Sequence, residues 1–495
     1  MKYQSTRNTG LSLSAAEAIM QGLSHDGGLF VPESLPVLTE EMIGKLAALP
    51  YAERAAVIMK LYLDDFSEAE LRTFTQRAYG NFDAAGAAPV RRLDPETSFM
   101  ELWHGPTCAI KDIALQILPY LLTASMKKTG EPKKVCILVA TSGDTGKAAL
   151  EGFRDVRDTA ILVFYPRDGV SDVQKLQMQS QTGNNVSVCA VEGNFDDAQT
   201  GVKQIFSDPE LAERLAAQGW FLSSANSINW GRLLPQIVYY ISAYCDFLNE
   251  GAVRPGEKIS FCVPTGNFGD ILAGYYAMKM GLPVKRLICA SNSNDVLTEF
   301  FRTGTYDRCR PFFTTVSPSM DILISSNLER LIFDVSGRDA AYVSSCMAQL
   351  KENGRYTVTP EIRGSLDRIF WAGCCDEDGT KAQIGKVWRE HGYLMDTHTA
   401  VAHQVLEQYR ASENADENVV VVSTASPFKF CNAVLEGLGE APESSGLDAL
   451  DKLEKVTGTA APKPLSALRR AEVRFTQCVE KEQMPAVVEK FLQEN

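Results

Sequence analysis

Short apolar segments alternate with helical segments from residue 134 onwards, and this alternation limits the folds open to the chain. Each apolar segment is a continuous run bounded by polar residues or glycine. Such runs, separated by helices, predict βαβ units and a parallel sheet that is covered on both faces. The predicted strands are Val135–Ala140, Ala160–Tyr165, Val186–Val191, Ile259–Val263, Leu287–Ala290 and Val419–Val422.

The segments between those strands carry apolar residues at helical spacing. The predicted helices are Lys147–Phe153, Asp172–Gln181, Asp196–Phe206, Leu233–Leu248, Phe268–Met280 and Asp295–Arg302. Residues 1–90 differ, because their pattern is mostly helical and they end in the Gly- and Ala-rich stretch Ala84–Ala88 before Pro89. We therefore expect an N-terminal domain packed on an α/β body. After Phe430 the pattern is again helical and ends in the amphipathic stretch Met484–Leu492.

The composition narrows the class of protein. A length of 495 residues predicts about three domains or lobes. Hydrophobic residues at 45% and charged residues at 22% are typical of a soluble globular enzyme and exclude a disordered chain. The net charge of −13, from 49 basic and 62 acidic residues, argues against nucleic acid and anionic membranes as partners.

Cysteine spacing and the N-terminus indicate a cytoplasmic protein. The 12 cysteines form no CxxC pair, which favours free thiols over a disulfide or zinc scaffold. The polar N-terminus lacks the apolar core of a signal peptide, and Gln236 and Asp246 interrupt the longest apolar stretch. His398 and His403 do not have the spacing of a metal-binding HExxH motif, so we expect no metal site.

Three turns join predicted strands to predicted helices, where α/β sheets bind ligands. The first, Ala140–Lys147, has two residues between its glycines and no Ser or Thr after its lysine, so it is not a Walker A loop. It would still suit a carboxylate or a phosphate at a helix N-terminus, although an ordinary capped turn explains it equally well. The second, Pro264–Asp270, has two glycines and an asparagine, which favour an anion site. The third, Ser423–Lys429, is by itself best explained as a capped turn.

Lys111 is a candidate for covalent catalysis. It precedes the apolar segment Ile113–Leu122 and closes the segment Trp103–Asp112. Apolar neighbours would desolvate its amine and lower its pKa, as a Schiff-base lysine requires. Composition alone would make it an ordinary surface lysine.

Taken together, these segments resemble the motifs of the threonine synthase family, a group of pyridoxal phosphate (PLP) enzymes of fold type II. The similarity runs from residue 3 to about residue 430, and the combination is specific although each piece alone is weak. The corresponding segments are Tyr3–Arg7 with Asp26–Pro32 for the family's opening, His104–Asp112 for HGPTxAFKD, Thr141–Gly146 for TSGDTG, Asn226–Arg232 for NSxNxxR and Pro264–Asp270 for PTGNFGD.

Three positions depart from the family pattern. Ile110 stands where the family has Phe before its lysine, and Thr397 stands for Pro in DPHTAV. Ser426 stands for His in TAHPAKF, so no role of that histidine carries over to this chain.

The resemblance implies roles for the matched residues. Lys111 would hold PLP and move protons at the substrate carbons, the glycine loop would hold the PLP phosphate, Thr424 would bind the ring nitrogen, and Asp144 would lie near the ring hydroxyl. The residues implied at the cofactor are Lys111, Gly266, Asn267, Phe268, Gly269, Asp270, Thr424 and Asp144. Those implied at the substrate are Thr141, Ser142 and Thr145 for its α-carboxylate, and Ser227, Asn229 and Arg232 for its phosphate.

The resemblance also implies an architecture and a reaction. The fold class is α/β, with two parallel-sheet lobes of the fold type II kind and a mostly helical N-terminal domain. The expected ranges are 1–90 for the N-terminal domain, 91–114 with 216–440 for the large PLP-binding lobe, 115–215 for a small mobile lobe and 441–495 for a C-terminal helical segment. The implied reaction converts O-phospho-L-homoserine and water into L-threonine and phosphate, in a monomer or a homodimer.

Two other functions stay open. A serine or threonine dehydratase of the same fold group would share the lysine and the glycine loop, but it would not need Ser227 and Arg232 as a phosphate clamp. A threonine-synthase-like binding or regulatory protein could have lost activity. The intact Lys111, the loop 266–269 and Thr424 argue against that last interpretation.

Overall fold

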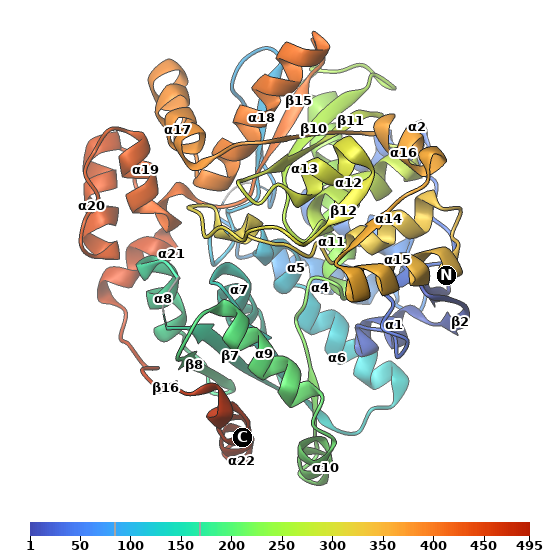
Figure 1. The fold of residues 1–495 in the computed structure, drawn as a ribbon, viewed down its shortest axis with the longest axis vertical. Coiled ribbons are helices and arrows are strands. Elements are labelled where there is room, and N and C mark those ends of the chain that lie inside the picture. The colour runs from blue at the N-terminus through green and yellow to red at the C-terminus, as the bar shows by residue number, and fades with distance from the viewer. Residues whose placement is uncertain (84–85, 168–169) are drawn as a thin grey trace.

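The computed structural model describes residues 1–83, 86–167 and 170–495 (Figure 1). Its larger parallel sheet has six strands. Its strand order is β14-β11-β10-β15-β5-β4, and every neighbouring pair is parallel except β4 with β5. The strands are β4 (Val90–Arg92), β5 (Thr97–Glu101), β10 (Ile259–Pro264), β11 (Val284–Ser291), β14 (Phe370–Cys374) and β15 (Val419–Ser423).

Helices cover both faces of this sheet, as its apolar strands require. Alternate residues of β10 show the two faces: Phe261 and Val263 belong to the core shared with helix α12 (Gly269–Met280). Cys262, between them, belongs to the core shared with helix α18 (Thr397–Glu413). The sheet is therefore buried between helical layers, and its ligand-binding groups are confined to its ends.

The second sheet has five parallel strands in the order β16-β8-β7-β6-β9. Its strands are β6 (Lys134–Ala140), β7 (Thr159–Pro166), β8 (Val186–Val191), β9 (Trp220–Ser223) and β16 (Cys478–Val479). The six strands predicted from apolar runs are all present in the two sheets. The predicted helices are also present, as α7 (Asp144–Phe153), α8 (Asp172–Gln179), α9 (Phe195–Phe206), α11 (Trp230–Asn249), α12 and α13 (Val296–Thr303).

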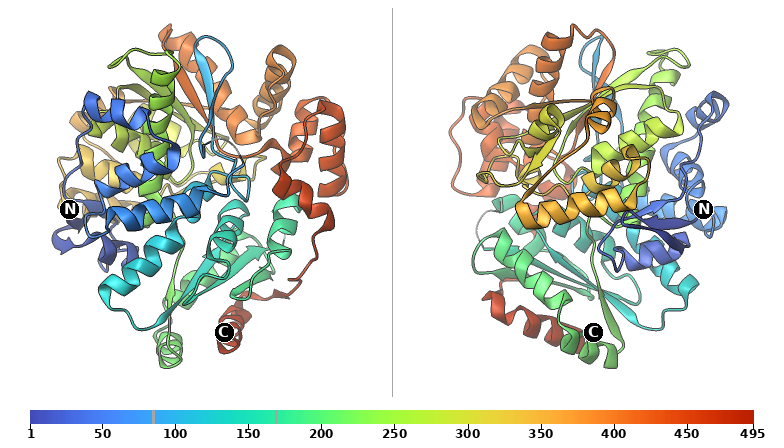
Figure 2. Two further views of the ribbon diagram at one scale, coloured as in Figure 1. Left: turned by 180° about the vertical axis from the view of Figure 1, so that it is seen from behind. Right: turned by 45° about the vertical axis from the view of Figure 1, so that its right-hand side comes forward.

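This second sheet includes strands outside the range expected for the small lobe, 115–215. Strand β9 lies beyond residue 215 but pairs with β6, and β16 comes from the segment 441–495 and pairs with β8. Helix α22 (Met484–Gln493) then packs against α9. Figure 2 shows the red C-terminal segment reaching from the larger body to this sheet. Strands this short carry too little pattern to be recognised, and their partners are distant in sequence.

The N-terminal region is mostly helical, as predicted, but it also contains a small sheet. Its helices are α1 (Ala15–Gln21), α2 (Glu40–Ala47), α3 (Tyr51–Lys60) and α4 (Glu68–Tyr79). The antiparallel strands β1 (Tyr3–Ser5), β2 (Asn8–Leu13) and β3 (Phe30–Pro32) accompany them in the order β2-β1-β3. The predicted linker Ala84–Ala88 includes residues 84 and 85, which lie outside the described residues.

Helix α11 is the longest of the apolar helices and is buried along most of its length. It packs against α2, α3 and α12, so its hydrophobic faces are covered by protein. Within the described ranges, no helix combines the length and the apolar composition needed to cross a membrane.

Candidate active site

The carboxyl ends of strands from both sheets meet at one cavity, as expected for parallel sheets. Strand β10 leads into the glycine loop, β15 into Thr424, and β6 into the turn before α7. About 750 Å³ of space here is free of protein atoms, a volume that includes the solvent at the cavity mouth. The predicted residues that line it are Lys111, Asp144, Ser227, Arg232, Gly266, Asn267, Phe268, Gly269, Asp270 and Thr424.

Lys111 is the first residue of helix α5 (Lys111–Leu115) and is half-buried in the cavity wall. Burial lowers the pKa of its amine to about 8; the positive charge of Arg232 adds to this shift, and Asp144 and Asp270 oppose it. No acceptor among the described residues bonds to Nζ. The amine is therefore free to react with a bound group, and its lowered pKa is the shift that the sequence predicts.

The glycine loop between β10 and α12 presents bare backbone to the cavity. Phe268 has a φ of +65° and stands immediately before α12, so the chain turns sharply into the helix. In the described structure, the N–H groups of residues 266 to 269 donate to no protein acceptor. Unsatisfied N–H groups at a helix N-terminus attract an anion. The Gly266 carbonyl accepts from Ser325 Oγ at 2.7 Å, which holds the loop in place.

We expect Gly266→Ala to weaken anion and cofactor binding. A Cβ on Gly266 would lie 2.4 Å from the carbonyl oxygen of Ser319, so the loop or the segment around Ser319 has to move. Overpacking of this kind costs about 1–3 kcal/mol of stability. A penalty of this size on the PLP-binding loop should also weaken PLP binding. Because about 1.4 kcal/mol corresponds to a factor of ten in affinity, spectroscopic titration with PLP should show at least about a tenfold weaker affinity. The control is Gly44→Ala, which meets no atom within 4 Å and should bind PLP like the wild type. Equal affinity of Gly266→Ala and wild type would contradict the proposed loop role.

Arg232 is a buried cation without a carboxylate. Its side chain is 2% exposed, Nη1 donates to the carbonyl of Ala225, and buried Nε has no partner. No described carboxylate forms an ion pair with it, and burial lowers its pKa to about 10. An unpaired buried charge is costly, so an anion bound in the cavity would gain from this guanidinium.

Four of the predicted substrate residues do not line the cavity. The amide of Asn229 is engaged at both ends, since Oδ1 accepts from the Gly231 N–H at 2.8 Å and Nδ2 donates to the Ile19 carbonyl at 2.9 Å. Asn229 thereby caps α11 and holds α1. The Thr141 hydroxyl accepts from the N–H groups of two glycines in its own turn, at 3.0 and 2.9 Å. Ser142 and Thr145, in the same turn, lie outside the lining.

Asp270 faces two tyrosines. Its Oδ1 accepts from the hydroxyls of Tyr239 and Tyr240, the latter at 2.8 Å, and its buried Oδ2 has no partner. Burial raises the pKa of Asp270 to about 6, although both tyrosines and Lys111 act in the opposite direction. It therefore secures the start of α12 beneath the glycine loop.

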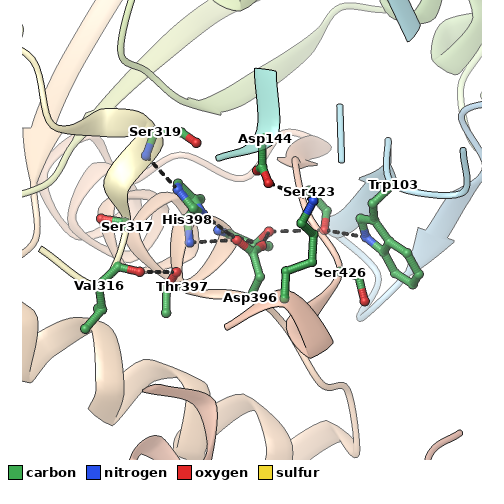
Figure 3. A network of polar contacts seen from close by, with 12 residues as sticks. Trp103, Asp144, Val316, Ser317, Ser319, Asp396, Thr397, His398, Ser423 and Ser426 are labelled. Carbon is green, nitrogen blue, oxygen red and sulfur yellow. Dashed lines mark hydrogen bonds and ion pairs between the residues drawn. The ribbon is translucent and has the colours of Figure 1, made fainter. Parts of the chain in front are cut away.

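His398 and Ser319 line the cavity and were not predicted there (Figure 3). His398 Nε2 accepts from the Ser319 N–H at 3.2 Å, and Nδ1 bonds to Asp396 Oδ2 at 2.7 Å. Asp396 is fully buried and caps α18. The segment Asp396–Val401 matches a family motif, but sequence reasoning assigned it no role. Ser426, the departure from the family, accepts from the Phe428 N–H and caps its own turn.

His104, in the loop before Lys111, lies between two carboxylates. Nδ1 is 2.7 Å from Asp83 Oδ1 and Nε2 is 2.7 Å from Glu101 Oε2. Burial alone would lower the pKa of His104, but the bonds to Glu101 and Asp83 outweigh it and raise the pKa above 6.5. A histidine whose pKa is raised by folding stabilises the folded protein. This stabilisation is complete at a pH below the pKa in the unfolded state, and it is lost as the pH rises through the pKa in the folded state.

We therefore expect His104→Gln to lower the free energy of unfolding by about 1–2 kcal/mol below pH 6, and by less as the pH rises above 6.5. Urea unfolding at several pH values between 5.5 and 8.5 measures the difference. The control is His25→Gln, at an exposed turn, which should be as stable as the wild type. A His104→Gln deficit that is constant across this range would exclude a charged imidazole.

Three family descriptions match successive parts of the chain. They are "Threonine synthase N terminus" over residues 2–79, "Pyridoxal-phosphate dependent enzyme" over residues 87–349, and "Threonine synthase, C-terminal" over residues 399–491. The central match includes Lys111, Arg232 and the glycine loop, and it covers more than half of the chain.

Known proteins agree with these matches. The chain is 40% identical to a threonine synthase of Pseudomonas aeruginosa, over 89% of this chain and 92% of that protein. It is also 40% identical to threonine synthase-like 1 of Homo sapiens, over 86% of this chain and 58% of that longer protein. The crystal structure of PLP-bound threonine synthase from Brucella melitensis superposes with a TM-score of 0.88 at 37% identity, covering 100% of this chain and 99% of that one. The chain belongs to the threonine synthase family of PLP-dependent enzymes.

Proposed function

We propose that this chain converts O-phospho-L-homoserine and water into L-threonine and phosphate. The observation that carries the substrate assignment is Arg232, a buried cation without a carboxylate partner among the described residues, in the cavity that also contains Lys111. The substrate carries a phosphate on its γ-carbon. The cavity therefore has to hold a second phosphate besides that of the cofactor.

The residues present fit PLP. The N–H groups of residues 266 to 269 are free of protein acceptors, and Gly266 leaves room where a Cβ would collide. The Lys111 amine is free and has a pKa of about 8. When bound, PLP supplies an electron sink for negative charge at the substrate Cα.

Lys111 would hold the cofactor and then take and return protons at the substrate carbons. A pKa of about 8 leaves about one amine in ten unprotonated at pH 7, which a base requires. Over the whole reaction, the C–O bond at Cγ breaks and phosphate leaves, Cβ loses a proton and gains the hydroxyl of water, Cγ gains a proton, and the second proton of the water goes to the phosphate. Thr424 would bind the ring nitrogen of PLP, and Asp144 would face its ring hydroxyl.

Ser227 and Arg232 would bind the substrate phosphate, with the Arg232 fork offering two N–H donors. Asn229 would act on this pair through the start of α11, which it caps. Thr141, Ser142 and Thr145 would receive the α-carboxylate. Because Ser142 and Thr145 lie outside the present lining, that contact requires the turn before α7 to approach the substrate, as mobility of the small lobe would allow.

The test is direct detection of threonine after PLP-loaded protein is mixed with O-phospho-L-homoserine. Threonine and phosphate in equal amounts would support the proposal. Suppose that the protein binds PLP and forms no threonine from O-phospho-L-homoserine, but forms 2-oxobutyrate when threonine is supplied as the substrate. That result would instead indicate a dehydratase. PLP binding with neither product would indicate a binding protein and overturn the proposal.

A further inference from the structure

Lys429 and Asp144 form a buried ion pair beside the cavity. Lys429 Nζ is 2.7 Å from Asp144 Oδ1, and the two side chains are 0% and 6% exposed. Lys429 lies in the 3₁₀ turn η2 (Pro427–Lys429) after β15, whereas Asp144 begins α7 after β6. The pair therefore connects the six-stranded sheet to the five-stranded sheet. Figure 3 shows Asp144 together with His398.

The same lysine connects this pair to the loop that carries Lys111. Lys429 Nζ donates to the Thr107 carbonyl at 2.9 Å. Thr107 in turn donates through its N–H and its hydroxyl to Asp112, at 2.8 and 2.7 Å, and Asp112 is the residue after Lys111. One ammonium group thus fixes Asp144 relative to the reactive lysine.

One oxygen of Asp144 is occupied and the other is available. Oδ1 accepts from Lys429 and from Gln174 Nε2, the latter at 2.8 Å. Oδ2 has no partner among the described residues, and Asp144 lines the cavity. Burial by itself would raise the pKa of Asp144, but Lys429 and Gln174 outweigh it and lower the pKa. The carboxylate is therefore held as an anion that presents one free oxygen.

We propose that Lys429 is a positioning residue for the cofactor: it orients Asp144 and balances its charge, so that the pair, and not a lone carboxylate, meets the ring hydroxyl of PLP. A lone carboxylate beside an acidic hydroxyl would repel its ionised form and raise its pKa. The adjacent ammonium cancels that repulsion. This inference rests on PLP binding and is independent of which amino acid is the substrate.

The ionisable groups near Asp144 are Lys429, His398 from α18, Lys111 from α5 and the buried thiol of Cys108 in the loop before α5, while α8 contributes the neutral Gln174. A change in Lys429 alters one of these charges and leaves the rest in place. The effect on the cofactor is therefore separable by substitution.

The experiment is a pH titration of the absorption spectrum of bound PLP in four proteins: wild type, Lys429→Met, Asp144→Asn and the double variant. We expect Lys429→Met to raise the pH midpoint of the spectral transition by at least about one unit, and Asp144→Asn, which leaves the ammonium unbalanced, to lower it. The double variant should return towards the wild-type midpoint, because both charges are absent. Lys429→Arg should keep the wild-type midpoint.

The matched control is Lys381→Met, which breaks the 2.6 Å ion pair with Glu436 between two other helices and should leave the midpoint unchanged. Wild-type midpoints in both Lys429→Met and Asp144→Asn would overturn the inference. If Lys429→Met does not fold, an unshifted midpoint in Asp144→Asn overturns it alone. A wild-type protein without a PLP spectrum would instead overturn the proposed function. Thermal unfolding of the PLP-free proteins separates a loss of fold from a change at the cofactor.

Discussion

Lys111→Ala is expected to abolish threonine formation, with a fall of at least about 10³-fold in kcat. The substitution removes the amine that would hold PLP and the group that would move protons at the substrate carbons. Because Nζ bonds to no described acceptor, the fold should lose little from its removal. The visible absorption that PLP gains when it is joined to a lysine should also disappear.

Lys258→Ala is the control for this variant, since Lys258 is exposed just before β10 and should keep full activity and full colour. Threonine formation is measured as the amino acid itself, and cofactor attachment by the absorption spectrum and by mass after borohydride reduction. A Lys111→Ala protein that keeps the band would place the attachment at another lysine. Lys429, the other buried lysine near this cavity, would then be the next candidate.

Arg232→Met is expected to lower kcat/KM for O-phospho-L-homoserine by roughly 10²–10³-fold, while the PLP spectrum is retained. The guanidinium has a free Nε beside the cavity and no ionic partner among the described residues, so its charge is available to the substrate phosphate. The kcat/KM of Arg232→Lys should lie between those of the wild type and Arg232→Met, because an ammonium keeps the charge but loses the fork of parallel donors. In buffer without phosphate, Arg232→Met should unfold at about the wild-type temperature, since removing an unpaired buried charge relieves its desolvation.

Arg330→Met is the matched comparison. Arg330 is fully buried as well, but all three of its nitrogens donate, to the carbonyls of Phe30 and Ile228 and to Asn327 Oδ1. Its loss leaves these acceptors unpaired and should cost several kcal/mol of stability. If Arg232→Met were as unstable as Arg330→Met and kept its kcat/KM in the folded fraction, Arg232 would be a structural residue. The phosphate site would then have to be sought elsewhere.

The local sequence pattern was sufficient to predict a strand wherever that strand is a continuous apolar run. Strands β6, β7 and β10 were predicted because burial on both faces demands such runs. Strand β5 was missed although it is buried and paired on both sides, because Thr97, Ser98 and Glu101 make it look polar. Its polar side chains are accommodated by specific partners, such as Arg410 for Thr97 and Tyr393 for Glu101, which no local pattern reveals.

Motifs located the site, but they did not show which side chains face it. Asn229 and Arg232 stand three residues apart in one motif, and yet Asn229 caps a helix while Arg232 lines the cavity. His398 was recognised as part of a motif without a role. Its place in the cavity wall depends on Ser319, in a segment for which the sequence predicts no element.

By itself, the sequence determined the alternation of apolar strands and helices, the candidate lysine and the family, because periodicity, turn chemistry and motif spacing are properties of neighbouring residues. Only the tertiary structure decided which charges meet. Strand β15 pairs with β5 and brings Lys429 to Thr107, and the approach of the two sheets brings Lys429 to Asp144. Such contacts depend on strand order and on the packing of segments that are hundreds of residues apart, and side-chain burial fixes their energies once that packing exists.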